Sequence, residues 1–99
     1  MPTDVTYTVN EARELLPAIR ATLLQVALER RTRADPASLE ALLGHLEALG
    51  VAVRDLEAGL VDIPTVRDGR RAWLCWRLDD PDLGWWHTTR EGFSSRRPL

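Results

Sequence analysis

Apolar residues in the first third of the chain recur with the period of an α-helix. They lie four and three positions apart, at Ala12, Leu16, Ile19, Leu23 and Val26, and this spacing places them on one stripe of a helix. The segment from Thr8 to Glu11 has the spacing of a capping box, which satisfies free amide groups at a helix start. We therefore predict a helix from this segment to about Arg31. Because Pro17 lacks an amide donor, we expect either a kink there or a helix that restarts at that residue.

A second apolar stripe predicts a second helix. Asp35 followed by Pro36 is typical of a helix start, with the aspartate as cap and the proline in the first turn. The leucines that follow lie at coiled-coil spacing, at Leu39, Leu42, Leu46 and Leu49. Because the connection between the two stripes is short, the helices must run antiparallel. We expect them to pack as a helical hairpin over about residues 8–50.

Gly50 leaves two interpretations of the next segment. The heptad stripe can continue as helix through Val53, Leu56 and Leu60. Alternatively, Gly50 ends the helix in a left-handed conformation, and residues 51–55 begin a strand. We favour the second interpretation, because a β-branched residue directly after Leu-Gly is common where a helix gives way to a strand.

The remainder of the chain has the pattern of short antiparallel strands. Residues 60–66 alternate between apolar and polar, and Asp68-Gly69 is a strong hairpin signal. Residues 71–78 form the next expected strand, residues 79–82 an acidic loop, and residues 83–88 a returning strand. The tail, about 90–99, is rich in Gly, Ser and Arg and is expected to be irregular. We predict one α+β domain over residues 1–99, with the helical hairpin packed on one face of an antiparallel meander of three or four strands (about 51–89).

The expected turns fix which side chains share a face of the sheet. The hairpin at Asp68-Gly69 pairs Asp62 with Cys75, and a four-residue acidic loop pairs Cys75 with Trp86. The face expected to pack on the helices then carries Val61, Ile63, Leu74, Trp76, Leu78, Leu83, Trp85 and His87. The opposite face carries Asp62, Pro64, Trp73, Cys75, Arg77 and Trp86. Two helices cannot cover both faces, so we expect the second face to meet another subunit or a ligand.

Composition and charge exclude several classes of protein. A net charge of −2 and a pI near 5.6 argue against a general nucleic-acid binder. The single cysteine excludes an internal disulfide and a multi-cysteine zinc site. The sequence contains no apolar run of the roughly 20 residues that a membrane span requires. Residues 1–4 lack the features of a signal peptide, so we expect a cytoplasmic protein with no membrane association.

The candidate chemistry lies in the strands. Cys75 and His87 are a pair that can bind a metal or form a thiol catalyst, but the expected register places them on opposite faces. We therefore predict no metal site, no cofactor and no catalytic residues, with Cys75 as a small buried residue and His87 at the core edge. Asp62 and Arg77 lie diagonally on one face. They form either a bridge that fixes the register or part of an anion site.

In the anion site, Arg77 would bind a carboxylate or phosphate, and Trp73 or Trp86 would stack on its ring. A separate basic region is expected around the hairpin turn and the tail, formed by Arg67, Arg70, Arg71, Arg96 and Arg97. With exposed tryptophans such a region can bind single-stranded nucleic acid. Nearby aspartates dilute it, so we do not favour that function.

Several short motifs resemble one protein family. In the second half of the chain they are Gly59-Leu60-Val61-Asp62-Ile63-Pro64, Asp68-Gly69-Arg70, Leu74-Cys75-Trp76-Arg77, Trp86-His87, and Gly92-Phe93 followed by Arg96. Near the start they are Tyr7-Thr8, Glu11-Ala12 and Leu15-Leu16-Pro17. The chain is thus similar to the domain-of-unknown-function family 2203, small prokaryotic proteins without an assigned activity. The resemblance implies no catalytic or binding residues. The helices look shorter than is usual in that family, because the chain has fewer residues in the region around 33–38.

These observations predict a non-enzymatic binding or assembly module that forms a homodimer through the tryptophan-bearing face of its sheet. The alternative is a protein that binds a small anion, or a small enzyme, with its site around Asp62, Arg77, Trp86 and His87. The candidate binding residues are Asp62, Trp73, Arg77, Trp86 and His87.

Overall fold

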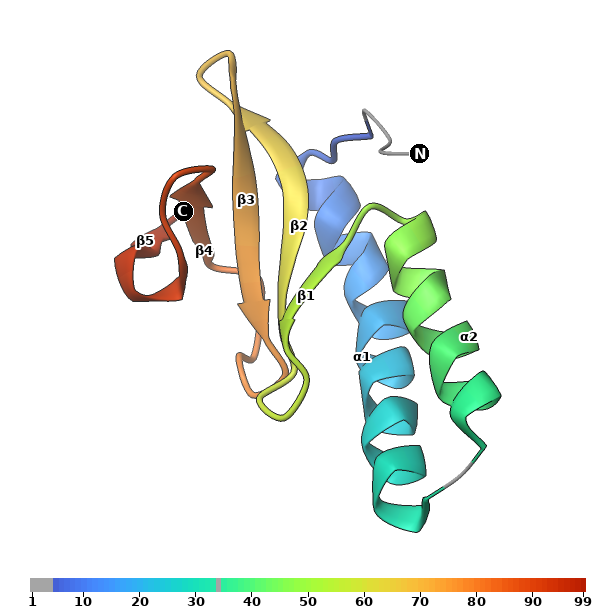
Figure 1. The fold of residues 1–99 in the computed structure, drawn as a ribbon. Helices are drawn as coiled ribbons and strands as arrows, with labels where there is room; N and C mark the ends of the chain where they lie inside the picture. The colour runs from blue at the N-terminus through green and yellow to red at the C-terminus, as the bar shows by residue number, and fades with distance from the viewer. Residues whose placement is uncertain (1–4, 34) are drawn as a thin grey trace.

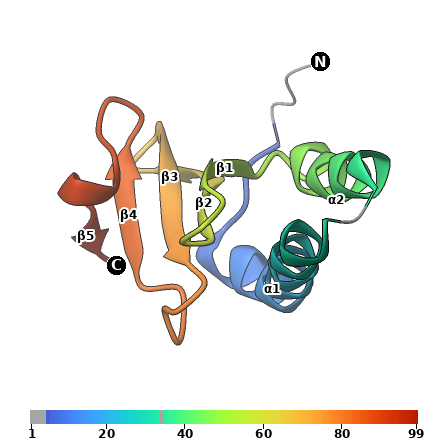
Figure 2. The same cartoon turned by 60° about the horizontal axis from the view of Figure 1, so that its bottom comes forward.

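A computed structural model of the protein describes residues 5–33 and 35–99, and it places a helical hairpin beside one face of an antiparallel sheet (Figures 1 and 2). The helices are α1 (Val9–Thr32) and α2 (Pro36–Ala48). The strands are β1 (Ala52–Asp55), β2 (Leu60–Arg67), β3 (Arg70–Arg77), β4 (Trp85–Thr88) and β5 (Arg97–Pro98). They follow one another across the sheet in chain order. The predicted α+β class is confirmed, with one strand more than expected.

Both helices begin at the predicted caps. The Thr8 hydroxyl accepts a hydrogen bond from the Glu11 amide at 3.1 Å, and the Glu11 carboxylate accepts one from the Thr8 amide at 2.8 Å. Asp35 caps α2 by accepting from the Ala37 amide at 3.0 Å. Because α1 continues through Pro17, the predicted restart does not occur. No helix of the described residues is long and apolar enough to cross a membrane.

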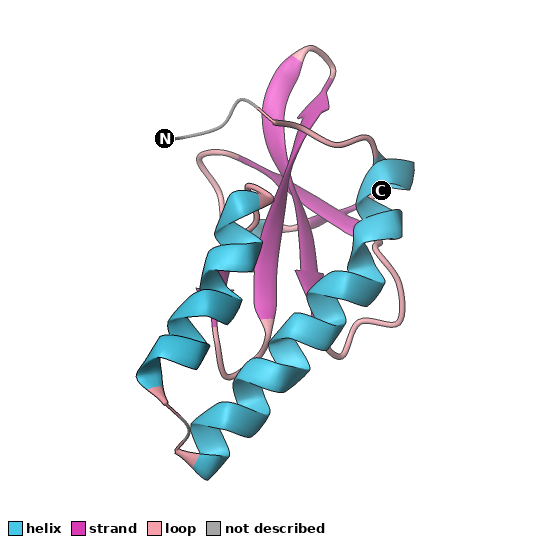
Figure 3. Ribbon diagram, turned by 90° about the vertical axis from the view of Figure 1, so that its right-hand side faces the viewer, coloured by secondary structure: helices cyan, strands magenta, loops and turns pink. Residues whose placement is uncertain are grey.

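The predicted apolar stripe of α1 forms one wall of the core, and its five members are all buried. Four of them, Ala12, Leu16, Ile19 and Leu23, share one core cluster with Val61, Ile63, Leu74 and Trp76 of the sheet and with Leu83 of the connection before β4. In α2 only Leu46 is fully buried, and the other seam leucines are half-buried. Figure 3 shows both helices in front of the sheet, and Figure 1 shows the connected end of the hairpin extending beyond it. The first turns of α2, next to the connection with α1, therefore have little to pack against except α1.

Gly50 ends the helical region as favoured. Its φ is +79°, a conformation that glycine adopts without steric cost. β1 then begins at Ala52 and pairs with β2. The alternative, in which the helix continues through Val53, is therefore wrong.

The register between β2 and β3 is the predicted one. Asp68 and Gly69 both have positive φ, as a type I′ turn requires. This turn pairs Asp62 with Cys75 and Ile63 with Leu74. Because a two-residue turn fixes which residues of the two strands face each other, the register of β2 and β3 could be predicted from the sequence.

The register between β3 and β4 is displaced by one residue from the prediction. Trp85 pairs with Cys75, and His87 pairs with Trp73. The cause lies in the acidic loop: Asp80 accepts a hydrogen bond from the Arg77 amide at 3.0 Å, and its own amide donates to the Arg77 carbonyl at 2.8 Å. This turn ends β3 at Arg77, so the connection covers residues 78–84 instead of the predicted four.

A shift of one residue turns every side chain of a strand to the opposite face. Trp86 therefore lies on the helix-bearing face, opposite Leu74, whereas Trp85 lies beside Cys75 on the other face. His87 joins this second face. The predicted faces of all three β4 residues are wrong.

The tail is not irregular as predicted. It forms a 3-10 turn, η1 (Phe93–Ser95), and then β5, which pairs with β4 at the sheet edge. Arg96 forms an ion pair with Asp80 at 2.9 Å, and both side chains are largely buried. The Arg96 guanidinium also lies 4.6 Å from the ring centre of Trp85 and 4.4 Å from that of Phe93. The tail therefore covers part of the face that was expected to be open.

Candidate functional site

Three chemically active side chains meet on the face of the sheet opposite the helices. Asp62 comes from β2, Cys75 from β3 and His87 from β4. One ligand atom from each lies within 4.8 Å of the other two. Their exposed fractions are 3%, 1% and 2%, respectively. The displaced register of β4 produces this cluster, and it corrects our prediction that Cys75 and His87 are separated by the sheet.

Hydrogen bonds fix Asp62 and His87. His87 Nε2 lies 2.9 Å from Asp62 Oδ1, and His87 Nδ1 lies 2.8 Å from the Thr88 carbonyl oxygen. The second carboxylate oxygen of Asp62 accepts a hydrogen bond from Arg54 Nε at 2.9 Å. Arg54 in turn stacks on Trp73, with its guanidinium carbon 5.0 Å from the ring centre.

Cys75 is not an activated nucleophile in this setting. Burial raises the pKa of its thiol to about 11, and the negative charge of Asp62 acts in the same direction, while the Arg96 guanidinium opposes them. At neutral pH the thiol therefore keeps its proton. Thiolate chemistry requires a lowered thiol pKa, so this cysteine does not match the environment of a thiol catalyst.

The predicted partnership of Asp62 with Arg77 does not form. Both residues lie on the second face, but Arg77 Nε binds Asp79 at 2.6 Å, and its guanidinium lies 5.2 Å from the Phe93 ring centre. Asp62 is satisfied by Arg54 and His87 instead. The structure thus keeps Asp62, Trp73, Arg77 and His87 on one face, with Arg77 paired to Asp79 instead of Asp62.

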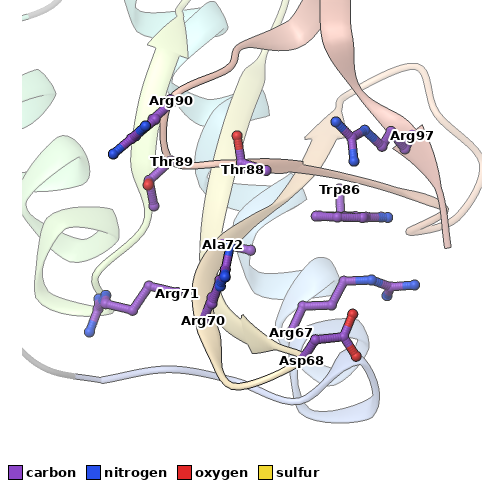
Figure 4. A pocket seen from close by; sticks show the side chains of 10 residues that line it. All are labelled: Arg67, Asp68, Arg70, Arg71, Ala72, Trp86, Thr88, Thr89, Arg90 and Arg97. Carbon is purple, nitrogen blue, oxygen red and sulfur yellow. The ribbon is translucent and has the colours of Figure 1, made fainter.

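Trp86, the remaining predicted site residue, lies at a different place. It borders a pocket of about 720 Å³ on the other face of the sheet, at the hairpin end (Figure 4). The pocket is lined by Arg67, Asp68, Arg70, Arg71, Ala72, Trp86, Thr88, Thr89, Arg90 and Arg97. Five of these are arginines and one is an acid. Figure 4 shows the Trp86 ring edge-on, with Arg67 on one side and Arg97 on the other.

Stacking on the tryptophan holds two of these arginines. The guanidinium carbons of Arg67 and Arg97 lie 4.6 and 5.2 Å from the Trp86 ring centre. Arg97 also pairs with Glu91 at 3.1 Å. Within residues 5–33 and 35–99, no ion pair is formed by the other pocket arginines, Arg67, Arg70, Arg71 and Arg90.

Of the four aspartates that were expected to dilute this basic region, three are engaged elsewhere, and Asp68 lines the pocket itself. Asp79 pairs with Arg77, Asp80 with Arg96, and Asp82 with Arg13 at 3.5 Å. Of the predicted basic region, Arg67, Arg70, Arg71 and Arg97 line the pocket. Arg96 belongs to the opposite face, where it reaches Asp80 and Trp85.

Sequence reasoning missed several residues of both sites. Arg90 and the neighbouring threonines line the pocket because the chain turns back into the tail after β4. Arg54 reaches Asp62 because the two side chains lie on paired strands. For Arg90 and the threonines, the available signal was the run Thr88-Thr89-Arg90 at the end of the last predicted strand.

The fold and these two clusters define a small α+β protein with an arginine-lined pocket on one face of its sheet and a buried Asp-Cys-His group on the other. Comparison with family models gives a match over residues 25–99 to DUF2203, described as an uncharacterised conserved protein. The chain belongs to this family. Comparisons with curated proteins and with solved structures gave no match.

Proposed function

We propose that the protein is a binding module for a small molecule that carries phosphate or carboxylate groups. The observation that supports this proposal is the gathering of five arginines and a single acid, Asp68, around one pocket. Guanidinium groups bind carboxylate and phosphate through two parallel hydrogen bonds. Because arginines outnumber acids around the pocket, its electrostatic potential is positive and attracts an anion.

The size and lining of the pocket suit a small organic anion. Its volume of about 720 Å³ lies within the range of small-molecule sites, roughly 300–1,000 Å³. Ala72 contributes only a methyl group between the longer side chains, which leaves room on that part of the wall. The hydroxyl of Thr89 adds a neutral donor beside the arginines.

Trp86 contributes by ordering the arginines. A guanidinium that stacks on an indole keeps its N–H groups in its own plane, directed away from the ring face. Less side-chain entropy is then lost when an anion binds. The ligand contacts that we propose are therefore the edges of Arg67 and Arg97, together with Arg70, Arg71 and Arg90.

A thermal-shift series tests this proposal. We expect phosphate, pyrophosphate, nucleotides or small dicarboxylates to raise the unfolding temperature of the wild-type protein, because a ligand stabilises the state that holds its site. Arg67→Gln and Arg70→Gln should each reduce the shift strongly. Arg31→Gln, at the far exposed end of α1, is the matched control and should leave it unchanged.

Two results would contradict the proposal. One is the absence of stabilisation by every anion at constant ionic strength. The other is an equal loss of stabilisation in Arg31→Gln and Arg67→Gln, which indicates general screening of charge.

Self-association through the second face remains the other proposed function. Its support is weaker than the sequence suggested, because Cys75 is buried and Trp73 and Trp85 are half-buried under arginine side chains. Among the described residues, the large hydrophobics with high exposure include no tryptophan.

A further inference from the structure

The buried group of Asp62, Cys75 and His87 contains the three side-chain types that bind zinc. Carboxylate, thiolate and imidazole are all common Zn²⁺ ligands. The three residues come from three neighbouring strands of one sheet, a rigid support. Their ligand atoms already lie within 4.8 Å of one another.

The Thr88 carbonyl oxygen determines which ring nitrogen of His87 can act as a ligand atom. Nδ1 faces the Thr88 carbonyl oxygen at 2.8 Å, and a carbonyl oxygen can only accept, so the proton of a neutral ring lies on Nδ1. Nε2 then directs its lone pair at Asp62 Oδ1, 2.9 Å away. A second proton on Nε2 makes this contact a hydrogen bond to Asp62, and a metal ion can take the place of that proton.

We propose that Asp62, Cys75 and His87 bind one divalent transition-metal ion, preferentially Zn²⁺. Histidine ligands of metals commonly donate their other ring N–H to a backbone carbonyl, and the Thr88 carbonyl occupies that position for His87. A mixed sulfur and nitrogen ligand set favours zinc over magnesium or calcium. Three protein ligands leave the fourth tetrahedral position for water.

The required movement is small. Zinc–ligand distances of about 2.0–2.3 Å place tetrahedral ligand atoms about 3.3–3.6 Å apart. Asp62 Oδ1 and His87 Nε2 now lie 2.9 Å apart, so they must separate by only a few tenths of an ångström. The Cys75 Sγ atom lies within 4.8 Å of the other two ligand atoms, so it must approach them by up to about 1.2 Å.

The charges of the ligands match those of a divalent cation, and the Arg54 guanidinium that also binds Asp62 is about half exposed to solvent. One carboxylate and one thiolate neutralise a divalent cation, so the filled site buries no net charge. Arg54 binds Oδ2 of Asp62 and leaves Oδ1 for the metal. Arg96, which lies near Cys75, is paired with Asp80 at 2.9 Å and adds no uncompensated charge.

Cobalt titration of metal-free protein tests this site. Co²⁺ should bind with one ion per chain and give the near-ultraviolet charge-transfer band of a thiolate ligand, and Zn²⁺ should then displace it. Cys75→Ala should abolish the band, and His87→Gln should weaken metal binding at least about tenfold. His45→Gln removes the other, exposed histidine and is the matched control, which should bind as the wild type does.

The wild-type spectrum decides the matter even if a variant fails to fold. Absence of Co²⁺ binding, or binding without a thiolate band, would overturn the proposal. So would binding that survives Cys75→Ala but is lost in His45→Gln. The arginine pocket lies on the other face of the sheet, so Arg67→Gln should bind the metal unchanged, and failure of one site leaves the other standing.

Discussion

At the scale of single residues, the two adjacent tryptophans of β4 have different environments. Trp85 lies beside Cys75 and under Arg96, and Trp86 lies opposite Leu74 and between two pocket arginines. Trp76 on β3 differs from both, because it is 0% exposed and packs in the core. The role of each tryptophan therefore follows from its strand position and not from its residue type.

Replacing two of these tryptophans by alanine should have distinct effects. Trp76→Ala should lower the free energy of unfolding by about 3–5 kcal/mol, the usual cost of removing a large buried aromatic. Trp86→Ala should cost less, about 1–2 kcal/mol, because this ring is half-buried, but it should remove most of the anion-dependent thermal shift. Urea unfolding with and without phosphate measures both effects. Equal destabilisation with an unchanged anion shift would contradict the assignment of the two rings.

At the scale of elements, the predictable parts are those that local chemistry determines. The capped α1 and α2 and the hairpin of β2 and β3 follow from Thr8, Asp35 and Asp68-Gly69, whose partners lie within a few residues. The β3–β4 register depends instead on Asp80, which folds back onto Arg77 and is held by Arg96 from the tail. Because Arg96 is distant from Asp80 in the sequence, the residues of the acidic loop alone did not indicate this ion pair.

The one-residue displacement of β4 against β3 also determines which residues of the candidate site could be predicted from the sequence. Asp62 and Cys75 are neighbours through the predictable hairpin, and the sequence places them together. His87 joins them only in the displaced register. Arg67, Arg70 and Arg71 were recognised as a basic region because they surround one turn, but Arg90 was not, since its position depends on the tail.

The Asp80 turn should make stability depend on acid. Burial acts to raise the pKa of Asp80. Hydrogen bonds from the Arg96 side chain and the Arg77 amide, together with the positive charges of the two guanidinium groups, hold that pKa below the ordinary 3.8. A lowered carboxyl pKa contributes stability that is complete above the ordinary value and is lost as the pH falls through the lowered one. Asp80→Asn should therefore be less stable than the wild type at pH 7, by about 1–3 kcal/mol.

Unfolding by urea at a series of pH values checks this expectation. The curves of the wild type and Asp80→Asn should converge as the pH falls below 3.8. Glu57→Gln, at an exposed residue in the turn after β1, is a suitable control. A difference that stays constant down to the lowest pH would show that the charge of Asp80 is not the source of its contribution.

At the scale of the whole molecule, the sheet separates two kinds of chemistry. The helix-bearing face ends in the arginine pocket, and the opposite face holds the Asp-Cys-His group beneath Arg54 and Arg96. The exposed apolar residues include Leu24 and Leu28, on successive turns of α1, at 53% and 45% exposure. Two copies of the chain could therefore associate through this apolar surface of α1 instead of through the sheet.

The homodimer expected from the sequence remains a prediction at this scale. If it forms through the second face, light scattering across a concentration series should give twice the mass of 11.2 kDa, and Trp73→Arg should shift it towards the monomer. The matched substitution Leu24→Arg should leave it intact. Dissociation by Leu24→Arg alone would place the interface on α1, and a monomer at high micromolar concentration would remove self-association as a function.

Binding of an anion beside Trp86 can be followed through the four indole N–H signals of the protein. Trp86 borders the pocket, Trp73 and Trp85 lie on the opposite face, and Trp76 is in the core. Titration of nitrogen-15-labelled protein with pyrophosphate at constant ionic strength should shift the Trp86 signal in a saturable manner and leave the other three nearly unchanged. A saturable shift of Trp73 or Trp85 instead, or no saturable shift of any indole, would show that no anion binds in the pocket beside Trp86.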